Sequence, residues 1–91
     1  MRLDLFLEAS RLSGRRTLAQ KLCDAGRVSV NGSTAKSSHV VKVGDEICIR
    51  RHNTLTTVRV LSVPTTRQTS RKDASSFYEV LREESLDDAE L

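Results

Sequence analysis

Residues able to perform metal or nucleophilic chemistry occur here as two cysteines and two histidines: Cys23, Cys48, His39 and His52. Together they offer the ligands of a zinc site, or a cysteine–histidine nucleophile pair. None of their spacings resembles a Cys-x-x-Cys or His-x₃-His pair, and no third group that would orient a nucleophile can be recognised. We therefore expect reduced cysteines that act as small buried hydrophobic residues, with no metal site, no cofactor and no catalysis.

The arginines indicate a second chemistry, the binding of phosphate. Eleven of the fifteen basic residues are Arg, whose guanidinium group matches a phosphate with two parallel hydrogen bonds. Residues 1–72 hold 14 basic and 5 acidic residues, a net charge of +9, whereas residues 73–91 carry a net charge of −6. A basic body with an acidic tail predicts a polyanionic partner for the body.

The length of the chain limits what these residues can be part of. Its 91 residues suffice for one small domain and a tail, without a separate catalytic domain. The longest apolar runs are three residues, against roughly twenty for a membrane span, and the start lacks the apolar stretch of a signal peptide. These features predict a cytoplasmic protein with no membrane partner.

Two short helices are expected to position the first basic residues. Residues 3–12 have an amphipathic pattern, and residues 15–25 place an apolar stripe opposite a polar face. Ser13 is the expected N-cap of the second helix and Gly26 its C-terminal cap. Arginines gathered at the start of this helix are understandable if a phosphate sits there, since a helix N-terminus attracts anions. The apolar stripe consists of Leu18, Ala19, Leu22, Cys23 and Ala25.

Alternating apolar residues after the helices predict a small antiparallel sheet of about four to five strands. Asn31-Gly32 is a strong signal for a hairpin turn, here between strands at 28–30 and 34–36. Pro64 stops the last strand. The other strands are expected near 40–42, 47–49 and 56–63.

The C-terminal third of the chain changes character after the sheet. The expected organisation is a domain at 1–63, a basic linker at 64–72, and a helix with an acidic tail at 73–91. The helix is expected from Asp73 to about Glu84. Its apolar residues Phe77, Val80 and Leu81 are spaced so that they would share one face of a helix.

The basic residues of the helices and the hairpin can build one continuous surface. A rigid surface of this kind suits folded RNA, which is read through phosphate and 2′-hydroxyl geometry. The scarcity of aromatic residues argues against a base-stacking platform, and we expect Phe77 and Tyr78 to pack the C-terminal helix rather than to stack on bases. The candidate RNA-binding residues are Arg2, Arg11, Arg15, Arg16, Thr17, Lys21, Arg27, Asn31 and Lys36.

Four segments in this order resemble the S-four type RNA-binding domain, the alpha-L motif. They are Arg2-Leu3-Asp4, Arg15-Arg16-Thr17-Leu18-Ala19, Gly26-Arg27-Val28-Ser29-Val30-Asn31-Gly32 and Val43-Gly44-Asp45. The resemblance runs from residue 1 to about residue 50. It implies an α+β fold in which two N-terminal helices pack on a small antiparallel sheet.

Among proteins that consist of little more than this domain, the chain most resembles the bacterial RqcP family, also called YabO. The resemblance lies in the short length, the Met-Arg-Leu-Asp start, the Arg-Arg-Thr-Leu-Ala helix start and the expected Tyr-containing helix at 76–81. Leu5 and Ser13-Gly14 depart from the family pattern, which usually has lysines there. The small heat-shock protein of the same domain class is a second resemblance, but it ends in a basic extension, unlike the acidic end here.

The resemblance to RqcP implies a role in ribosome-associated quality control. Such proteins bind large (50S) ribosomal subunits that carry a stalled peptidyl-tRNA, contact 23S rRNA and the P-site tRNA, and support alanine tailing by an RqcH-type factor. The family's RNA-facing arginines correspond to Arg2 and Arg16, and we expect a monomer. The alternatives are a general RNA chaperone or rRNA assembly factor, a heat-shock-type recycling factor for obstructed large subunits, and an RNA-modifying activity completed by a partner.

Overall fold

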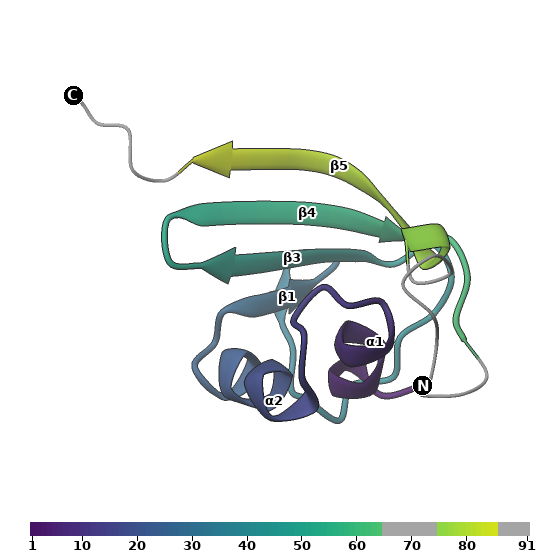
Figure 1. The fold of residues 1–91 in the computed structure, drawn as a ribbon, viewed down its shortest axis with the longest axis horizontal. Coiled ribbons are helices and arrows are strands. Elements are labelled where there is room, and N and C mark those ends of the chain that lie inside the picture. The colour runs from purple at the N-terminus through teal and green to yellow at the C-terminus, as the bar shows by residue number, and fades with distance from the viewer. Residues whose placement is uncertain (65–74, 86–91) are drawn as a thin grey trace.

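The computed structural model describes residues 1–64 and 75–85, which form a layer of two helices on one side of a five-stranded sheet (Figure 1). The elements are α1 (Leu3–Ala9), α2 (Arg16–Asp24), β1 (Val28–Val30), β2 (Ser33–Thr34), β3 (Glu46–Arg51), β4 (Thr54–Val60), the 3₁₀ turn η1 (Ser75–Phe77) and β5 (Tyr78–Ser85). The strand order is β2-β1-β3-β4-β5 and all pairs are antiparallel. The predicted α+β class, with two N-terminal helices on a small antiparallel sheet, is confirmed.

Helix α1 forms because its apolar residues recur three and four positions apart. Leu3, Phe6 and Leu7 have no exposed surface and face the sheet side of the helix. The helix ends at Ala9, three residues before the predicted end. The reason is the backbone of Arg11, which adopts a left-handed φ of +62° that a continuing helix cannot contain.

Helix α2 lies close to its predicted bounds, but its capping differs. Arg15 occupies the N-cap position and makes no side-chain capping bond, whereas Ser13 is buried and donates from Oγ to the carbonyl of Arg15 at 3.3 Å. The prediction of Ser13 as N-cap was therefore wrong. At the other end Gly26 has the left-handed φ of +73° that its predicted capping role requires.

The predicted hairpin turn is present between β1 and β2. Asn31 and Gly32 both have positive φ, +52° and +87°, as the two central residues of a type I′ turn do. The return strand covers only Ser33 and Thr34. The strand predicted at 40–42 is reduced to a single bridge between Arg2 and Val40.

Strand β5 occupies residues for which the sequence predicted a helix, and that prediction was wrong. Tyr78 and Val80 pair with Val60 and Val58 of β4, and Leu81 falls at an irregularity of the ladder. This bulge shifts the alternation by one residue, so that the spacing of the apolar residues looks helical while the backbone is extended. Residues 65–74 and 86–91, which include most of the predicted linker, the start of the predicted helix and the end of the acidic tail, lie outside the described residues.

The hydrophobic core lies between the helices and the centre of the sheet. Ile47 and Ile49 of β3 and Val58 and Val60 of β4 alternate toward the helices and are at most 1% exposed. Phe77 packs against this core from η1. Among the described residues, neither helix is long and apolar enough to cross a membrane.

Candidate nucleic-acid interface

One buried carboxylate, that of Asp4, brings the two most strongly predicted arginines together. Asp4 has no exposed surface, and Arg2 donates to it twice, from Nε to Oδ1 at 3.2 Å and from Nη2 to Oδ2 at 3.1 Å. Arg16 donates from Nε to Oδ2 at 3.4 Å, and Gln20 donates from Nε2 to the same oxygen at 3.1 Å. We call these four residues the Asp4 cluster.

The local backbone explains why these side chains meet. Arg2 precedes α1 in extended conformation, and the adjoining chain is held by hydrogen bonds from Leu3 N–H to the His39 carbonyl, 2.7 Å, and from Asp4 N–H to the Ser37 carbonyl, 3.1 Å. Arg16 opens α2, and the side chain four residues later, Gln20, lies on the same helical face. The Asp4 cluster therefore joins the start of α1 to the first turn of α2.

The charge of Asp4 is well compensated. Burial by itself raises the pKa of this carboxyl group. Hydrogen bonds from the side chains of Gln20 and Arg16 and from the Leu5 N–H, with the charge of Arg2, outweigh that effect, so the pKa lies below its ordinary value. A buried carboxylate without partners costs several kcal/mol, so the two arginines are held in place by the need to neutralise it.

The side chains of Arg2 and Arg16 are only partly covered by the rest of the protein. The side chain of Arg2 is 42% exposed and that of Arg16 is 37% exposed, although both contact Asp4. One carboxylate cannot cancel two guanidinium charges, so the Asp4 cluster has a net charge of +1. A pre-positioned cationic pair of this kind can bind a phosphate with little loss of side-chain entropy.

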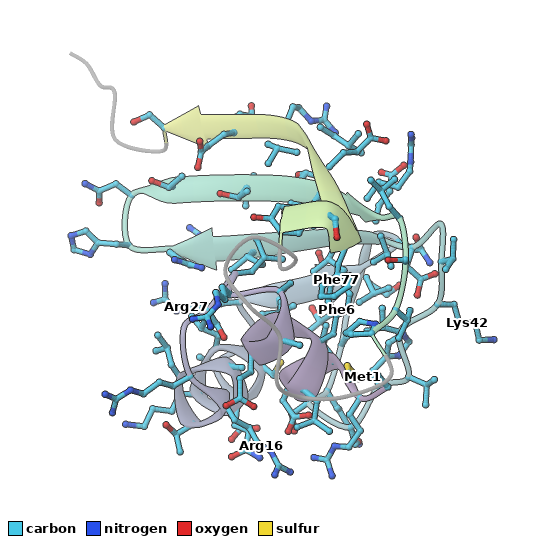
Figure 2. All side chains as sticks on the ribbon, turned by 45° about the vertical axis from the view of Figure 1, so that its right-hand side comes forward. Met1, Phe6, Arg16, Arg27, Lys42 and Phe77 are labelled. Carbon is cyan, nitrogen blue, oxygen red and sulfur yellow. The ribbon has the colours of Figure 1, made fainter. Side chains whose placement is uncertain are left out.

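Helix α2 extends the basic surface beyond the Asp4 cluster. Arg15, Thr17 and Lys21 are exposed, and Arg27 is exposed just after the helix, where its carbonyl accepts a hydrogen bond from Arg50 N–H at 2.8 Å. Figure 2 places Arg16 on the helical side of the molecule, away from β3 to β5, and Arg27 nearer to the sheet. Five of the nine predicted residues thus follow the course of α2.

The remaining predicted residues are not all brought to this surface. Arg11 lies in the loop after α1 and borders a cavity over β4 and β5. The Asn31 side chain is already engaged, donating to Asp45 Oδ1 at 3.1 Å and accepting from Glu46 N–H at 3.0 Å. Lys36 is exposed in the loop after β2. The predicted RNA contact of Asn31 therefore competes with a structural role.

Two members of the Asp4 cluster were not among the predicted site residues, Asp4 and Gln20. The signal for Asp4 was an acid between the apolar residues Leu3 and Leu5, two positions after an arginine. A carboxylate at a buried position requires cationic or hydrogen-bonding partners. The signal for Gln20 was weaker, since a glutamine on the polar side of an amphipathic helix is ordinary.

Cys23 is buried, as expected of a small hydrophobic residue. Burial raises the pKa of the Cys23 thiol to about 11, with help from the negative charges of Asp4 and Asp24, so this thiol is protonated near neutral pH. Cys48 is half-buried in β3, and both cysteines are free thiols. Within residues 1–64 and 75–85, no three metal-ligating side chains lie close enough together to hold an ion.

Comparison with known proteins defines first the class of the domain. The sequence model of the S4 domain matches residues 1–47, which contain both helices, the hairpin and the whole Asp4 cluster. The solved structure of Heat Shock Protein 15 from Vibrio cholerae, a trimer, superposes with a TM-score of 0.80 at 30% identity, covering 88% of this chain and 80% of that one. The chain is thus an S4-domain protein.

Full-length relatives narrow the class to one family. The RQC P-site tRNA stabilizing factor of Halalkalibacterium halodurans is 50% identical over 91 residues, which cover 99% of this chain and all of the relative. The factor of the same name from Bacillus subtilis is 48% identical over 86 residues, 94% of this chain and 98% of the relative. The chain belongs to the family of RQC P-site tRNA stabilizing factors, which confirms the resemblance seen in the sequence.

Proposed function

We propose that this chain is a non-catalytic RNA-binding factor of ribosome quality control in the cytoplasm. It binds large ribosomal subunits that carry a stalled peptidyl-tRNA and contacts 23S rRNA and the P-site tRNA together. By holding the tRNA in place it supports the addition of C-terminal alanine tails by an RqcH-type factor. The family membership supports the quality-control role, and the name of the relatives supports the tRNA as one ligand.

The observation that carries the proposal is the Asp4 cluster. Its guanidinium groups come from different elements and are fixed on one buried carboxylate, yet both remain more than a third exposed. This arrangement fits a rigid, folded backbone whose phosphates have fixed positions, such as rRNA or the body of a tRNA. Stabilising such a complex requires geometry and charge, and no bond has to be made or broken.

The exposed side chains of α2 extend the proposed contact. Arg15, Thr17, Lys21 and Arg27 follow the helix over its length of roughly 13 Å, about the reach of two or three successive backbone phosphates. A contact of this size neutralises several phosphates, so its affinity should fall steeply with salt. Arg11 and Lys36 are exposed in the loops after α1 and after β2, apart from this row of side chains along α2.

Sedimentation of the tagged chain with ribosomal particles tests this function. The wild type should migrate with free large subunits and co-purify with tRNA, and Arg16→Ala should move to the top of the gradient. Arg59→Ala is the matched control, because Arg59 also contacts carboxylates, those of Glu46 and Glu79, but lies on β4 outside the proposed contact. Equal sedimentation of both variants with large subunits would rule out the assigned surface.

A second function, recycling of obstructed large subunits or rRNA assembly, is favoured by the structural likeness to Heat Shock Protein 15. The two functions differ in the state of the subunit that is bound. A quality-control factor should select subunits that still carry peptidyl-tRNA, whereas an assembly factor should bind vacant or immature particles equally well. Large subunits purified with and without P-site tRNA separate the two.

A further inference from the structure

A cavity lies at a corner of the molecule that the S4 domain match does not account for. The helices cover only part of the sheet, and β4 and β5 extend past them (Figure 1). The loop after α1 approaches this overhanging part and borders an open hollow of about 520 Å³. Most of its lining comes from residues 49–83, beyond the match at residues 1–47.

The floor of this corner is apolar and contains an aromatic ring. Tyr78 and Val80 pair with Val60 and Val58, so they face the same side of the sheet as the core. Neither helix of the described part of the chain covers them there, and Val80 is 54% exposed while Tyr78 is half-buried. Leu12, from the loop after α1, also lines the corner, and both Leu12 and Tyr78 pack against the edge of the core. With Val80 they give the corner an apolar lining, which suits a flat apolar group.

The rim of the corner is cationic and conformationally unusual. Arg11 and Arg51 border it from the loop after α1 and from the end of β3. Among the described residues, three non-glycine residues have positive φ, and two of them, Arg11 and His52, line this corner. Such backbone conformations cost free energy and persist more often where they place functional side chains.

One carboxylate lines the same space. The carboxylate of Glu83 lines the corner and accepts from the Thr56 hydroxyl at 3.2 Å through Oε2. A carboxylate has room for further donors on its two oxygens. Guanine presents two adjacent donors on its Watson–Crick edge, the N1–H and the exocyclic amino group, whereas uracil presents only one N–H between two carbonyls.

We propose that this corner is a second RNA contact, which holds one unstacked base with a preference for guanine. The base stacks on Tyr78 against Leu12, its Watson–Crick edge donates to Glu83, and the adjoining phosphates meet Arg11 and Arg51. The choice of RNA as the ligand rests on the proposed function. The position of the contact, its aromatic floor and its base preference rest on the corner itself.

A nuclear magnetic resonance titration of the full chain with the trinucleotides UGU and UUU tests this site. We expect UGU to shift the backbone amides of residues 51–56 and 78–83 and to bind about tenfold more tightly than UUU. Tyr78→Leu should weaken UGU binding about tenfold, whereas Tyr78→Phe should keep it, since the ring supplies the stacking. Glu83→Gln should reduce the preference for UGU over UUU.

A variant of the other surface keeps the two proposals separable. Arg16→Ala should bind UGU like the wild type even if it no longer sediments with large subunits. Tyr78→Leu, in contrast, should bind UGU more weakly than the wild type. Shifts confined to α2, equal affinities for UGU and UUU, or loss of UGU binding in Arg16→Ala would each overturn the site. Retained UGU binding by a chain that does not bind large subunits would refute the proposed function alone.

Discussion

The Nε atom of Arg16 lies 3.4 Å from Oδ2 of Asp4, although the two residues are twelve positions apart and belong to different helices. The contact joins the first turn of α1 to the first residue of α2. Because Asp4 is buried and Arg16 is partly exposed, one interaction both holds the helix pair together and orients a side chain of the proposed RNA contact. The proposed function therefore couples stability to RNA binding at this point.

Replacing the buried carboxylate tests this coupling. Asp4→Asn keeps the size of the side chain but leaves Arg2 and Arg16 without their counter-charge, so we expect a loss of about 1–3 kcal/mol in the free energy of unfolding. Binding to large subunits should weaken as well, although the variant is more positively charged. Urea unfolding and sedimentation measure the two effects. Asp24→Asn, an exposed acid on α2, is the control, and equal behaviour of both variants would contradict the account.

The lowered pKa of Asp4 predicts a specific acid sensitivity. A carboxyl group whose folded-state pKa lies below its unfolded value of about 3.9 adds stability above that pH, and the stability is lost as the pH falls through the folded pKa. The difference in melting temperature between wild type and Asp4→Asn should therefore be largest near neutral pH and shrink below about pH 4. A difference that stays constant from pH 7 to pH 3 would show that the charge of Asp4 is not involved.

The salt dependence of binding counts the phosphate contacts. The logarithm of the binding constant for large subunits should fall linearly with the logarithm of salt concentration, and Arg16→Ala should reduce the slope by about one. Arg59→Ala should leave the slope unchanged. Titrations at four or more salt concentrations give the slopes, and equal slopes for wild type and Arg16→Ala would remove Arg16 from the phosphate contacts.

Asn31 separates a structural role from RNA binding. Its amide group bridges the β1–β2 turn to Asp45 and to the start of β3, so Asn31→Ala should destabilise the fold by about 1 kcal/mol. If this is its main role, the affinity for large subunits at a temperature well below unfolding should change less than twofold. A large loss of affinity in a fully folded Asn31→Ala variant would instead support the RNA contact predicted from the sequence.

The sequence was informative where local signals and tertiary packing agree. The helix pair follows from apolar spacing. The first hairpin follows from Asn31-Gly32, because these two residue types adopt the left-handed backbone at little cost in free energy. The C-terminal strand could not be predicted in this way, because the bulge at Leu81 makes a strand look helical. Only the edge of β4, a tertiary feature, decides that residues 78–85 are extended.

In the candidate site, too, residue types could be predicted from the sequence but their tertiary arrangement could not. Arg2 and Arg16 could be selected from residue type and family resemblance, but their meeting on Asp4 depends on how α1 packs beside α2. Sequence patterns along one helix cannot supply that distance. The corner over β4 and β5 was missed for a related reason, since Tyr78 was assigned to the packing of a helix that does not form.

The central claim is that this chain recognises a large subunit together with its P-site tRNA through the Asp4 cluster. The most direct measurement is the dissociation constant of the wild type and of Arg16→Ala for purified large subunits with and without peptidyl-tRNA. The account predicts that the wild type binds the tRNA-carrying subunit at least tenfold more tightly and that Arg16→Ala loses most of this affinity. Equal binding of the wild type to both subunits, or undiminished binding by Arg16→Ala, would contradict it.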